Sequence, residues 1–478
     1  MTESSLPAVA LIAEGMARFR DQMESNDRFS REISAKTKRI VGLAGIALAA
    51  TAIVTAALGV VALLAWALWW ATGVWSRLEL RPPASRVAAV AAVLAAGVAT
   101  AEIAHARGRL TGPFPVPGAA FTARVGLERV EMATRTLAEL RDFRAAALSD
   151  PFAGTGPLLG LLDRDVMVIF VESYGRTSID TPYFADLHRA TLEAGEDRLA
   201  DLGLAMRSGY LASPTRGGQS WLAHATLANG LRIDDQTRYG AALASGRETL
   251  FHIAARSGFR TAAVMPAITL DWPESARMGF DTVLAASDLG YRGKPFNWVT
   301  MPDQFTLAAF DRLLRPGTAG SPLFAQVALV SSHAPWVPVP ELVDWDALGD
   351  GTVFDEIAVS GDPPEVVWRD RARVRAQYRL SIDYALRTVI DYAARRAEDP
   401  PLLVVLGDHQ AAGFVALDER PDVPVHLIGP PALVARAAAW GFTPGLIPAD
   451  TAAALPMEDM RDLFIRTFSD VPEREDAS

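Results

Sequence analysis

The feature that most constrains this chain is an uncharged, strongly apolar run from Ile40 to Ser76. A membrane-spanning helix needs about 20 apolar residues, so this run is too long for one crossing and barely long enough for two. Half of all residues are hydrophobic, and the mean hydropathy is +0.15, which is unusual for a soluble enzyme. The run therefore predicts membrane crossings. The alternative is a set of hydrophobic helices buried in a soluble core.

A second, shorter apolar run extends from Val87 to Ala101, and it reaches Ala104 if Glu102 lies near the membrane interface. Tryptophans cluster near the end of the first run, as aromatic residues do at membrane surfaces (Trp66, Trp69, Trp70 and Trp75). Together the runs predict a transmembrane region over residues 39–106 with two to three spans. The first run starts too far into the chain, and is too long, for a cleaved signal peptide.

Basic residues around the two runs bear on orientation. One group precedes the first run (Lys36, Lys38 and Arg39), and another lies between the runs (Arg77, Arg81 and Arg86). Positive residues concentrate on the cytoplasmic side of membranes, so both groups fit a cytoplasmic segment over residues 1–38 and a tight hairpin in the first run. The chain then crosses three times and exports its C-terminal part. Arg107 and Arg109 favour the opposite orientation.

The composition excludes several kinds of chemistry. The chain has no cysteine, which rules out disulfides, thiolate metal sites and a cysteine nucleophile. The formal net charge is −10, so there is no global reason to expect a nucleic-acid partner.

Residues 107–163 are predicted to be a linker and a connector helix. Prolines at 113, 115 and 117 indicate a stiff linker, and apolar residues at helical spacing from Ala119 to Leu148 indicate a helix. Beyond residue 163, short β-branched runs alternate with helical stretches. The expected strands are 166–171, 261–264, 325–330, 402–406 and 423–428, and the expected helices include 249–257 and 367–396. This alternation predicts, for residues 164–478, an α/β fold with a mostly parallel sheet.

Polar side chains follow three of these strands directly. Glu172 follows the first, His333 the third, and Asp408 and His409 the fourth. Because ligands collect at the carboxyl ends of parallel strands, we expect these groups to converge there on one divalent metal ion, zinc or manganese. The alternatives are a Glu172 that caps a neighbouring helix, a His333 held by a backbone carbonyl, and a chance Gly-Asp-His sequence.

The order of these elements resembles the sulfatase-type domain of the alkaline phosphatase superfamily. The first strand with Glu172, the segment Thr181–Leu187, the strand leading to His333, and Gly407–His409 all match its pattern over residues 165–468. The resemblance implies an α/β/α sandwich with metal ligands at Glu172, Asp408 and His409, and with a catalytic His333 that binds or protonates the substrate. An N-terminal membrane region before such a domain is similar to lipoteichoic acid synthases and phosphoethanolamine transferases, which implies an integral membrane protein with an extracytoplasmic catalytic domain.

The segment from Ser213 to Leu222 has the features of a strand-to-helix turn that presents a hydroxyl group. Gly217 and Gly218 permit a tight turn, and a hydroxyl at a helix N-terminus faces free N–H groups that suit a phosphate. Similarity to the Gly-x-Thr turn of lipoteichoic acid synthases implies that Ser220 is the nucleophile and a metal ligand, with serine in place of their threonine. Thr215 is the second candidate, and the alternative is that Ser220 only caps the helix.

Two departures from the family narrow the expected reaction. Sulfatases carry Cys or Ser two residues before the proline of a Cys/Ser-x-Pro-x-Arg motif, where this chain has Ala212 before Pro214 and Arg216, which disfavours a formylglycine sulfatase. Trp272 and Arg277 are substrate-binding candidates by resemblance, but a nearby histidine of the synthases is replaced by Met265.

We therefore expect a membrane-anchored phosphotransferase that moves a phospho-headgroup between lipid and glycan or lipid acceptors through a phosphoserine. Its partners are phospholipid or glycan ester substrates and membrane lipids. The alternatives are a hydrolase of phosphate or sulfate esters and a non-catalytic membrane scaffold.

Overall fold

The structure is a computed structural model that describes residue 66 and residues 82–106, 121–315 and 321–470. The chain divides into two compact units, Met1–Arg129 and Val130–Ser478. The expected domain start at residue 164 therefore lies inside the second unit. Residues 150–162 explain this, because Phe152, Leu159 and Leu162 are buried in its core and Leu161 donates its N–H to the Phe468 carbonyl at 3.1 Å.

In the first unit, the structure describes helix α2 (Pro82–Ala106), which contains the second apolar run. Among the described residues, none of the helices combines the length and apolarity that a bilayer crossing requires. The second predicted crossing is therefore not confirmed, and the first run lies outside the described residues except for Trp66. Helix α3 (Phe121–Leu148) confirms the connector helix.

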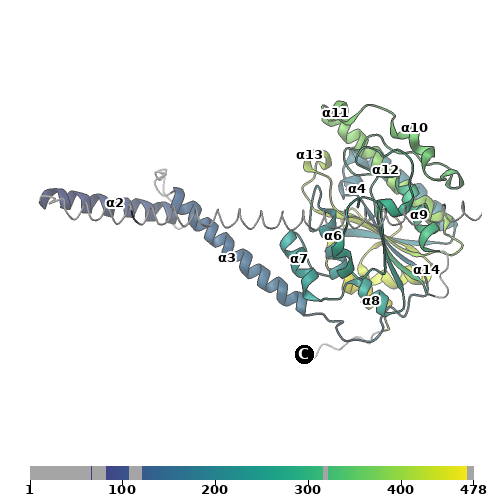
Figure 1. The fold of residues 1–478 in the computed structure, drawn as a ribbon, viewed down its shortest axis with the longest axis horizontal. Coiled ribbons are helices and arrows are strands. Elements are labelled where there is room, and N and C mark those ends of the chain that lie inside the picture. The colour runs from purple at the N-terminus through teal and green to yellow at the C-terminus, as the bar shows by residue number, and fades with distance from the viewer. Residues whose placement is uncertain (1–65, 67–81, 107–120, 316–320, 471–478) are drawn as a thin grey trace, which may run out of the picture. The chain divides into compact units, whose positions relative to one another are not determined.

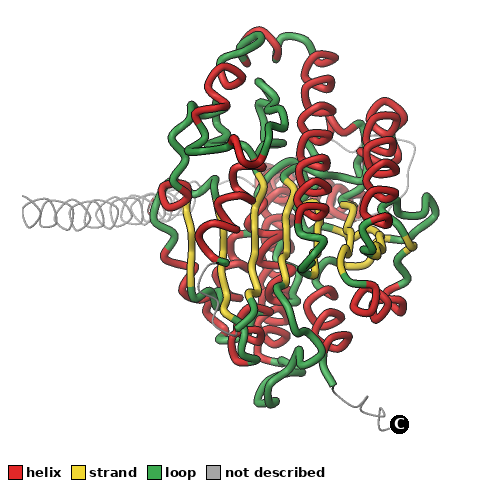
Figure 2. Tube along the Cα trace, turned by 90° about the vertical axis from the view of Figure 1, so that its right-hand side faces the viewer, coloured by secondary structure: helices red, strands yellow, loops and turns green. Residues whose placement is uncertain are grey.

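The second unit is built on one sheet whose strands run in the order β4-β3-β5-β1-β6-β7-β2-β8, with β9 also paired to β2. The first five are mutually parallel, and β7 is antiparallel to both β6 and β2. Figure 2 shows the strands side by side, with helices packed around them. The strands are β1 (Val166–Val171), β2 (Ala205–Ala212), β3 (Arg260–Met265), β4 (Thr282–Ala285), β5 (Leu323–Leu329), β6 (Leu402–Gly407), β7 (Asp422–Gly429), β8 (Thr443–Pro444) and β9 (Ala454–Pro456).

Strand β1 shows why the sheet needs helices on both faces. All six of its residues are buried, and they alternate between two cores: Met167, Ile169 and Val171 face one, and their neighbours face the other. The first core is covered by α4 (Thr177–Asp180), α5 (Pro182–Asp201), α9 (Asp303–Leu314), α10 (Asp355–Ala358), α11 (Pro364–Val367), α12 (Arg371–Arg395) and α13 (Gly413–Ala416). The second is covered by α6 (Ser220–Asn229), α7 (Gln236–Ser245), α8 (Leu250–Arg256), α14 (Pro431–Arg436) and α15 (Asp459–Phe468) (Figure 1).

These layers confirm the predicted α/β fold with a mostly parallel sheet. All five expected strands are present, as are the helices expected near 249–257 and 367–396, which are α8 and α12. Short 3-10 helices occupy the connections: η2 (Pro273–Arg277), η3 (Ala286–Leu289), η4 (Trp345–Ala347), η5 (Thr352–Phe354) and η6 (Ala437–Trp440).

Candidate metal centre

The sheet topology brings the predicted site residues to one edge. Strands β1, β5 and β6 are adjacent and parallel, so their carboxyl ends meet there and carry Glu172, His333 and the Asp408–His409 pair. Strand β2 runs in the same direction because two antiparallel pairings separate it from β6. Its carboxyl end therefore leads into Ser220 at the same edge.

The turn before Ser220 adopts a backbone conformation that its sequence makes possible. Gly217 and Gly218 have φ values of +69° and +138°, and Gln219 has +66°. The Thr215 hydroxyl donates to the Gly218 carbonyl at 2.6 Å and thereby closes the turn. Its oxygen is thus engaged within the turn.

Ser220 is the first residue of α6, and its Oγ donates to Glu172 Oε2 at 3.0 Å. The residue in the N-cap position is Gln219, which makes no side-chain capping bond. The interpretation of Ser220 as a simple helix cap is therefore wrong, because its hydroxyl points to the carboxylate at the end of β1.

Glu172, Asp408 and His409 offer ligand atoms that all lie within 4.8 Å of one another. His409 Nδ1 lies 3.0 Å from the Gln410 carbonyl and donates to it, which leaves Nε2 as a lone-pair donor. His409 Nε2 is buried and has no hydrogen-bond partner, although Glu172 Oε1 is 3.2 Å away. Asp408 Oδ1 accepts the N–H groups of Ser173 and His409 at 2.8 and 2.7 Å. A buried nitrogen that makes no hydrogen bond and lies beside the oxygens of two carboxylates fits a divalent cation such as zinc.

The pKa shifts of the three cluster residues also fit a bound cation. Burial raises the pKa of Asp408, and the neighbouring Glu172 carboxylate raises it further. Burial alone lowers the pKa of His409, but the charges of Asp408 and Glu172 outweigh burial and raise it. For Glu172, burial raises the pKa, but the close His409 imidazole outweighs burial, so the pKa of Glu172 is lowered. The cluster therefore attracts positive charge, and a cation that displaces the His409 proton satisfies it.

Gln410 links the site segments, a role that the sequence did not reveal. Its carbonyl accepts both His409 Nδ1–H and the Gly217 N–H, the latter at 2.7 Å. Its side-chain Oε1 accepts the Thr177 N–H at 3.2 Å. The same side chain lies against Gly175, where a Cβ would be 1.5 Å from Oε1, so only glycine fits. The loops after β1, β2 and β6 are thus held together.

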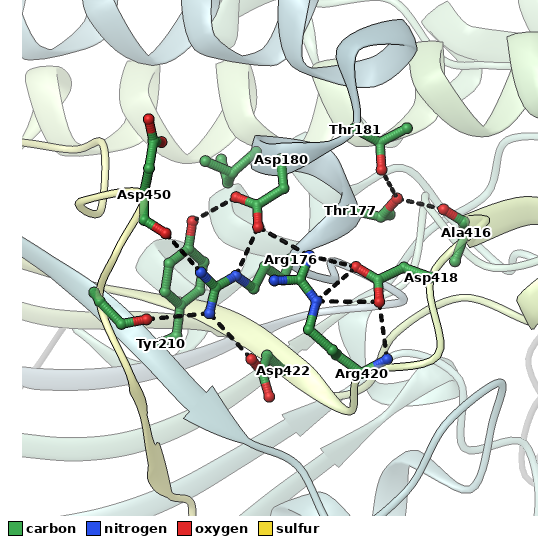
Figure 3. A network of polar contacts seen from close by, with 12 residues as sticks. Arg176, Thr177, Asp180, Thr181, Tyr210, Ala416, Asp418, Arg420, Asp422 and Asp450 are labelled. Carbon is green, nitrogen blue, oxygen red and sulfur yellow. Dashed lines mark hydrogen bonds and ion pairs between the residues drawn. The ribbon is translucent and has the colours of Figure 1, made fainter.

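A network of polar contacts centred on the buried Arg176 lies close to these loops (Figure 3). The Arg176 guanidinium donates to Asp180 at 2.8 Å and to Asp422 at 3.1 Å, and it lies over the Tyr210 ring, 3.9 Å from the ring centroid. The Arg176 guanidinium also donates to the carbonyls of residues 450 and 452, and these bonds attach the segment between β8 and β9 to the network. Arg420 extends the network to Asp180 at 2.9 Å. The network fixes the chain directly after Glu172.

His333 lies on the loop after β5, at the edge that carries the cluster. Ser332 Oγ donates to the Glu172 carbonyl at 2.6 Å, which ties the loop to β1. His333 Nδ1 lies 2.5 Å from the Ala334 carbonyl, and the His333 charge helps to lower the pKa of Glu172. The local carbonyl contact that we set out as an alternative is thus present, and it leaves Nε2 available to a substrate.

Trp272 and Arg277 lie farther along the edge, beyond β3. Trp272 lines a cavity of about 860 Å³ together with residues such as Asp271, Asp288 and Tyr291. Arg277 is exposed and donates to the Leu243 carbonyl at 3.3 Å. Within the described residues, neither side chain makes a hydrogen bond or ion pair with the cluster, so their predicted role in substrate binding stays a prediction.

Comparisons with known proteins agree with this architecture. The sulfatase family model matches residues 164–422, just over half of the chain. A search of curated proteins finds no match.

Similar solved structures include three bacterial transferases or synthases. For the lipoteichoic acid synthase of Listeria monocytogenes, identity is 14%, the match covers 57% of this chain and 66% of that chain, and the TM-score is 0.39. The soluble domain of lipooligosaccharide phosphoethanolamine transferase A from Neisseria meningitidis is 12% identical. That match covers 66% of this chain and 89% of that chain, with a TM-score of 0.43. The phosphoglycerol transferase of Streptococcus pyogenes is 10% identical. That match covers 70% of this chain and 91% of that chain, with a TM-score of 0.38. The chain thus spans just under two thirds of the Listeria protein.

The family match includes every residue of the cluster, from Glu172 through Ser220 to His409. The chain therefore belongs to the sulfatase family.

Proposed function

We propose that the protein is a metal-dependent phosphotransferase that uses Ser220 as its nucleophile. The observation that carries this proposal is the convergence of the Ser220 hydroxyl on the Glu172, Asp408 and His409 cluster. Glu172, Asp408, His409 and Ser220 would hold one zinc or manganese ion, which lowers the pKa of a bound hydroxyl and stabilises charge on phosphoryl oxygens.

The residues suggest a balanced first step. Ser220 Oγ attacks phosphorus, so an Oγ–P bond forms while the bond from phosphorus to the leaving oxygen breaks. Ser220 Oγ donates a hydrogen bond to Glu172 Oε2 across 3.0 Å, so this carboxylate is placed to receive the hydroxyl proton. His333 supplies a proton to the leaving alcohol. In the second step the acceptor oxygen bonds to phosphorus while the Oγ–P bond breaks. The acceptor hydroxyl gives its proton to His333, and Glu172 returns the first proton to Ser220 Oγ.

Two positions bear on the alternative reactions. Ala212, the last residue of β2, occupies the position at which sulfatases form formylglycine, and an alanine side chain does not support that chemistry. Water as the acceptor would make the protein a phosphate ester hydrolase. Product analysis with a lipid phosphate donor, with and without a sugar acceptor, separates transfer from hydrolysis.

We also propose a membrane-anchored enzyme with an extracytoplasmic catalytic unit. The support is the uncharged run from Ile40 to Ser76 and the basic residues around it. Protease protection of the full chain in oriented membranes tests the side on which the catalytic unit lies.

The nucleophile assignment is tested by trapping the phospho-enzyme. With a radiolabelled phosphodiester, the wild type and Thr215→Ala should acquire label, whereas Ser220→Ala should acquire none. Metal content is measured on the same samples, because Ser220→Ala must retain metal for the comparison to be valid. Label on Ser220→Ala but not on Thr215→Ala would assign the nucleophile to Thr215 instead.

A further inference from the structure

The helix that begins with Ser220 is buried on two sides. Eight of the ten residues of α6 are buried. Ala223 lies in the core against the sheet, whereas Leu222 and Ala225 lie in a separate apolar cluster. Phe143 belongs to that second cluster and comes from the part of α3 that lies within the second unit. The end of the connector helix therefore helps to cover the outer side of α6.

A buried arginine joins the C-terminal ends of α6 and α3. Arg247 is 9% exposed, and its Nε donates to the carbonyl of Asn229, the last residue of α6, at 2.7 Å. Its Nη1 donates to the carbonyls of Ser149 at 2.9 Å and Ala146 at 3.4 Å, at the end of α3. Within the described residues, the hydrogen-bond partners of this guanidinium are all carbonyls. Carbonyls at helix C-termini carry partial negative charge, which suits a buried cation. We call this contact the α3–α6 clamp.

The clamp and the nucleophile candidate lie at opposite ends of α6. A helix of ten residues is about 15 Å long, and its backbone hydrogen bonds make it move as a unit. Ser220 Oγ donates to Glu172 Oε2 at 3.0 Å, so a shift of about 1 Å along the helix axis is enough to remove this hydrogen bond. A misplacement of that size can slow a reaction by about 100-fold.

We propose that Arg247 is a positioning residue for the nucleophile, because the α3–α6 clamp fixes the helix that presents Ser220 to Glu172. This inference rests on the proposed function and adds the connector helix to the framework of the active site. The family match does not include this part of the framework, since Ala146 and Ser149 precede residue 164, where the match begins.

A competing account is that the turn before Ser220 fixes the hydroxyl without help from the clamp. The Gly217 N–H donates to the Gln410 carbonyl at 2.7 Å and attaches that turn to the loop after β6. On this account, loss of the clamp lowers stability and leaves the rate of phosphoryl transfer to Ser220 unchanged. The two accounts therefore differ in a measurable rate.

Arg256 provides a matched control for Arg247. Its guanidinium also holds backbone carbonyls of the segment that follows α3, at 2.9 Å for Thr155 and 3.2 Å for Phe152. Within the described residues, it makes no hydrogen bond to α6. Arg256→Gln therefore removes similar contacts to the same part of the chain without releasing the helix of the nucleophile.

The first measurement is single-turnover transfer from a radiolabelled, soluble nitrophenyl phosphodiester to Ser220 in the full chain. Arg247→Gln should lower the rate constant at saturating substrate by about 10–100-fold. The half-saturating substrate concentration and the metal content should stay as in the wild type. Arg247→Lys should recover part of the rate, because its ammonium group still donates to carbonyls. Arg256→Gln should keep the wild-type rate constant.

Hydrogen exchange detects the clamp without turnover. In Arg247→Gln, the amides of α6 should exchange about tenfold faster or more relative to the amides of β6 in the same protein. Dividing by the β6 rate removes the effect of a general loss of stability. Arg256→Gln should leave this ratio unchanged.

The proposal is overturned by a wild-type rate constant in Arg247→Gln, by an equal loss of rate in Arg256→Gln, or by a loss that comes only from weaker substrate binding. If Arg247→Gln does not fold, Phe143→Leu takes its place and should give a severalfold change in both measurements. Wild-type values in Phe143→Leu would then contradict the proposal. Absence of label on the wild type contradicts the proposed function, while the exchange ratio still decides whether the clamp holds α6.

Discussion

Replacing Gly175 with alanine should displace the loop that carries the metal-binding histidine. A Cβ at this position would lie 1.5 Å from Gln410 Oε1, 2.4 Å from its Cδ and 2.9 Å from its Cα. Ordinary contacts are 3.4–4 Å, so the Gln410 side chain and backbone both have to retreat. Because Gln410 follows His409 and its carbonyl orients that imidazole at 3.0 Å, the substitution acts directly on a proposed ligand.

The size of the effect follows from two losses. Overpacking a filled interior costs about 1–3 kcal/mol. Moving Gln410 Oε1 away leaves the buried Thr177 N–H without its acceptor, which costs a further ~1–3 kcal/mol. We therefore expect Gly175→Ala to lower the free energy of unfolding by about 2–6 kcal/mol. Disturbing a group that orients a metal ligand typically weakens metal affinity by ~10–100-fold.

The assays are denaturant unfolding of the metal-free protein and competition with a chelating indicator for metal affinity. Gly240→Ala is the control, because this helical glycine has no atom within 4 Å of a built Cβ, and it should stabilise the protein by up to ~1 kcal/mol. Wild-type stability and metal affinity in Gly175→Ala would refute the reasoning.

Three further predictions concern other residues. Arg461→Met leaves buried Asp150 without its partner at 2.6 Å and should cost about 3–5 kcal/mol in denaturant unfolding, whereas Arg395→Met breaks an exposed pair and should change stability by less than ~1 kcal/mol. Burial raises the pKa of Asp303 to about 6 from 3.8, so the folded state binds this proton more tightly than the unfolded state does. The free energy of unfolding should therefore fall by about 3 kcal/mol as the pH rises from ~4 to ~6. Asp303→Asn should remove that part of the pH dependence, and an unchanged unfolding profile would contradict the assignment. His333→Asn should lower kcat by ~10²–10⁴-fold while metal content, measured by mass spectrometry, stays constant, and loss of metal would instead give His333 a structural or ligand role.

The strands that the sequence predicts are those that are buried on both faces. Residues 166–171 and 402–406 form continuous apolar runs, and the structure places them side by side in the middle of the sheet. Since the carboxyl ends of such strands share one edge, the proximity of Glu172 to Asp408 and His409 could also be predicted.

Strand β2 was not predicted, because its sequence mixes polar, aromatic and small residues. Ser208 is buried, and its hydroxyl donates to the Gly445 carbonyl at 2.7 Å and contacts His426 Nδ1 at 2.8 Å. Gly209 lies against the Phe442 ring. These partners are more than 200 residues away in the sequence, so local patterns do not reveal them.

The Arg176 network and the role of Gln410 escaped prediction for the same reason. Arg176 meets Asp422 and the carbonyls of residues 450 and 452, which only the folded sheet brings together. Their residue types are common on protein surfaces, and nothing in their spacing marks them as buried partners.

The central claim is that the fold gathers Glu172, Ser220, Asp408 and His409 around one cation. Metal stoichiometry by mass spectrometry on the purified full chain tests it most directly, with His409→Ala and, as a control, His252→Ala, a histidine that caps α8. The account predicts one zinc or manganese ion per chain in the wild type and in His252→Ala, and no stoichiometric metal in His409→Ala. A wild-type protein that binds no divalent metal after zinc or manganese is supplied, or a His409→Ala variant that retains a full equivalent, would contradict it.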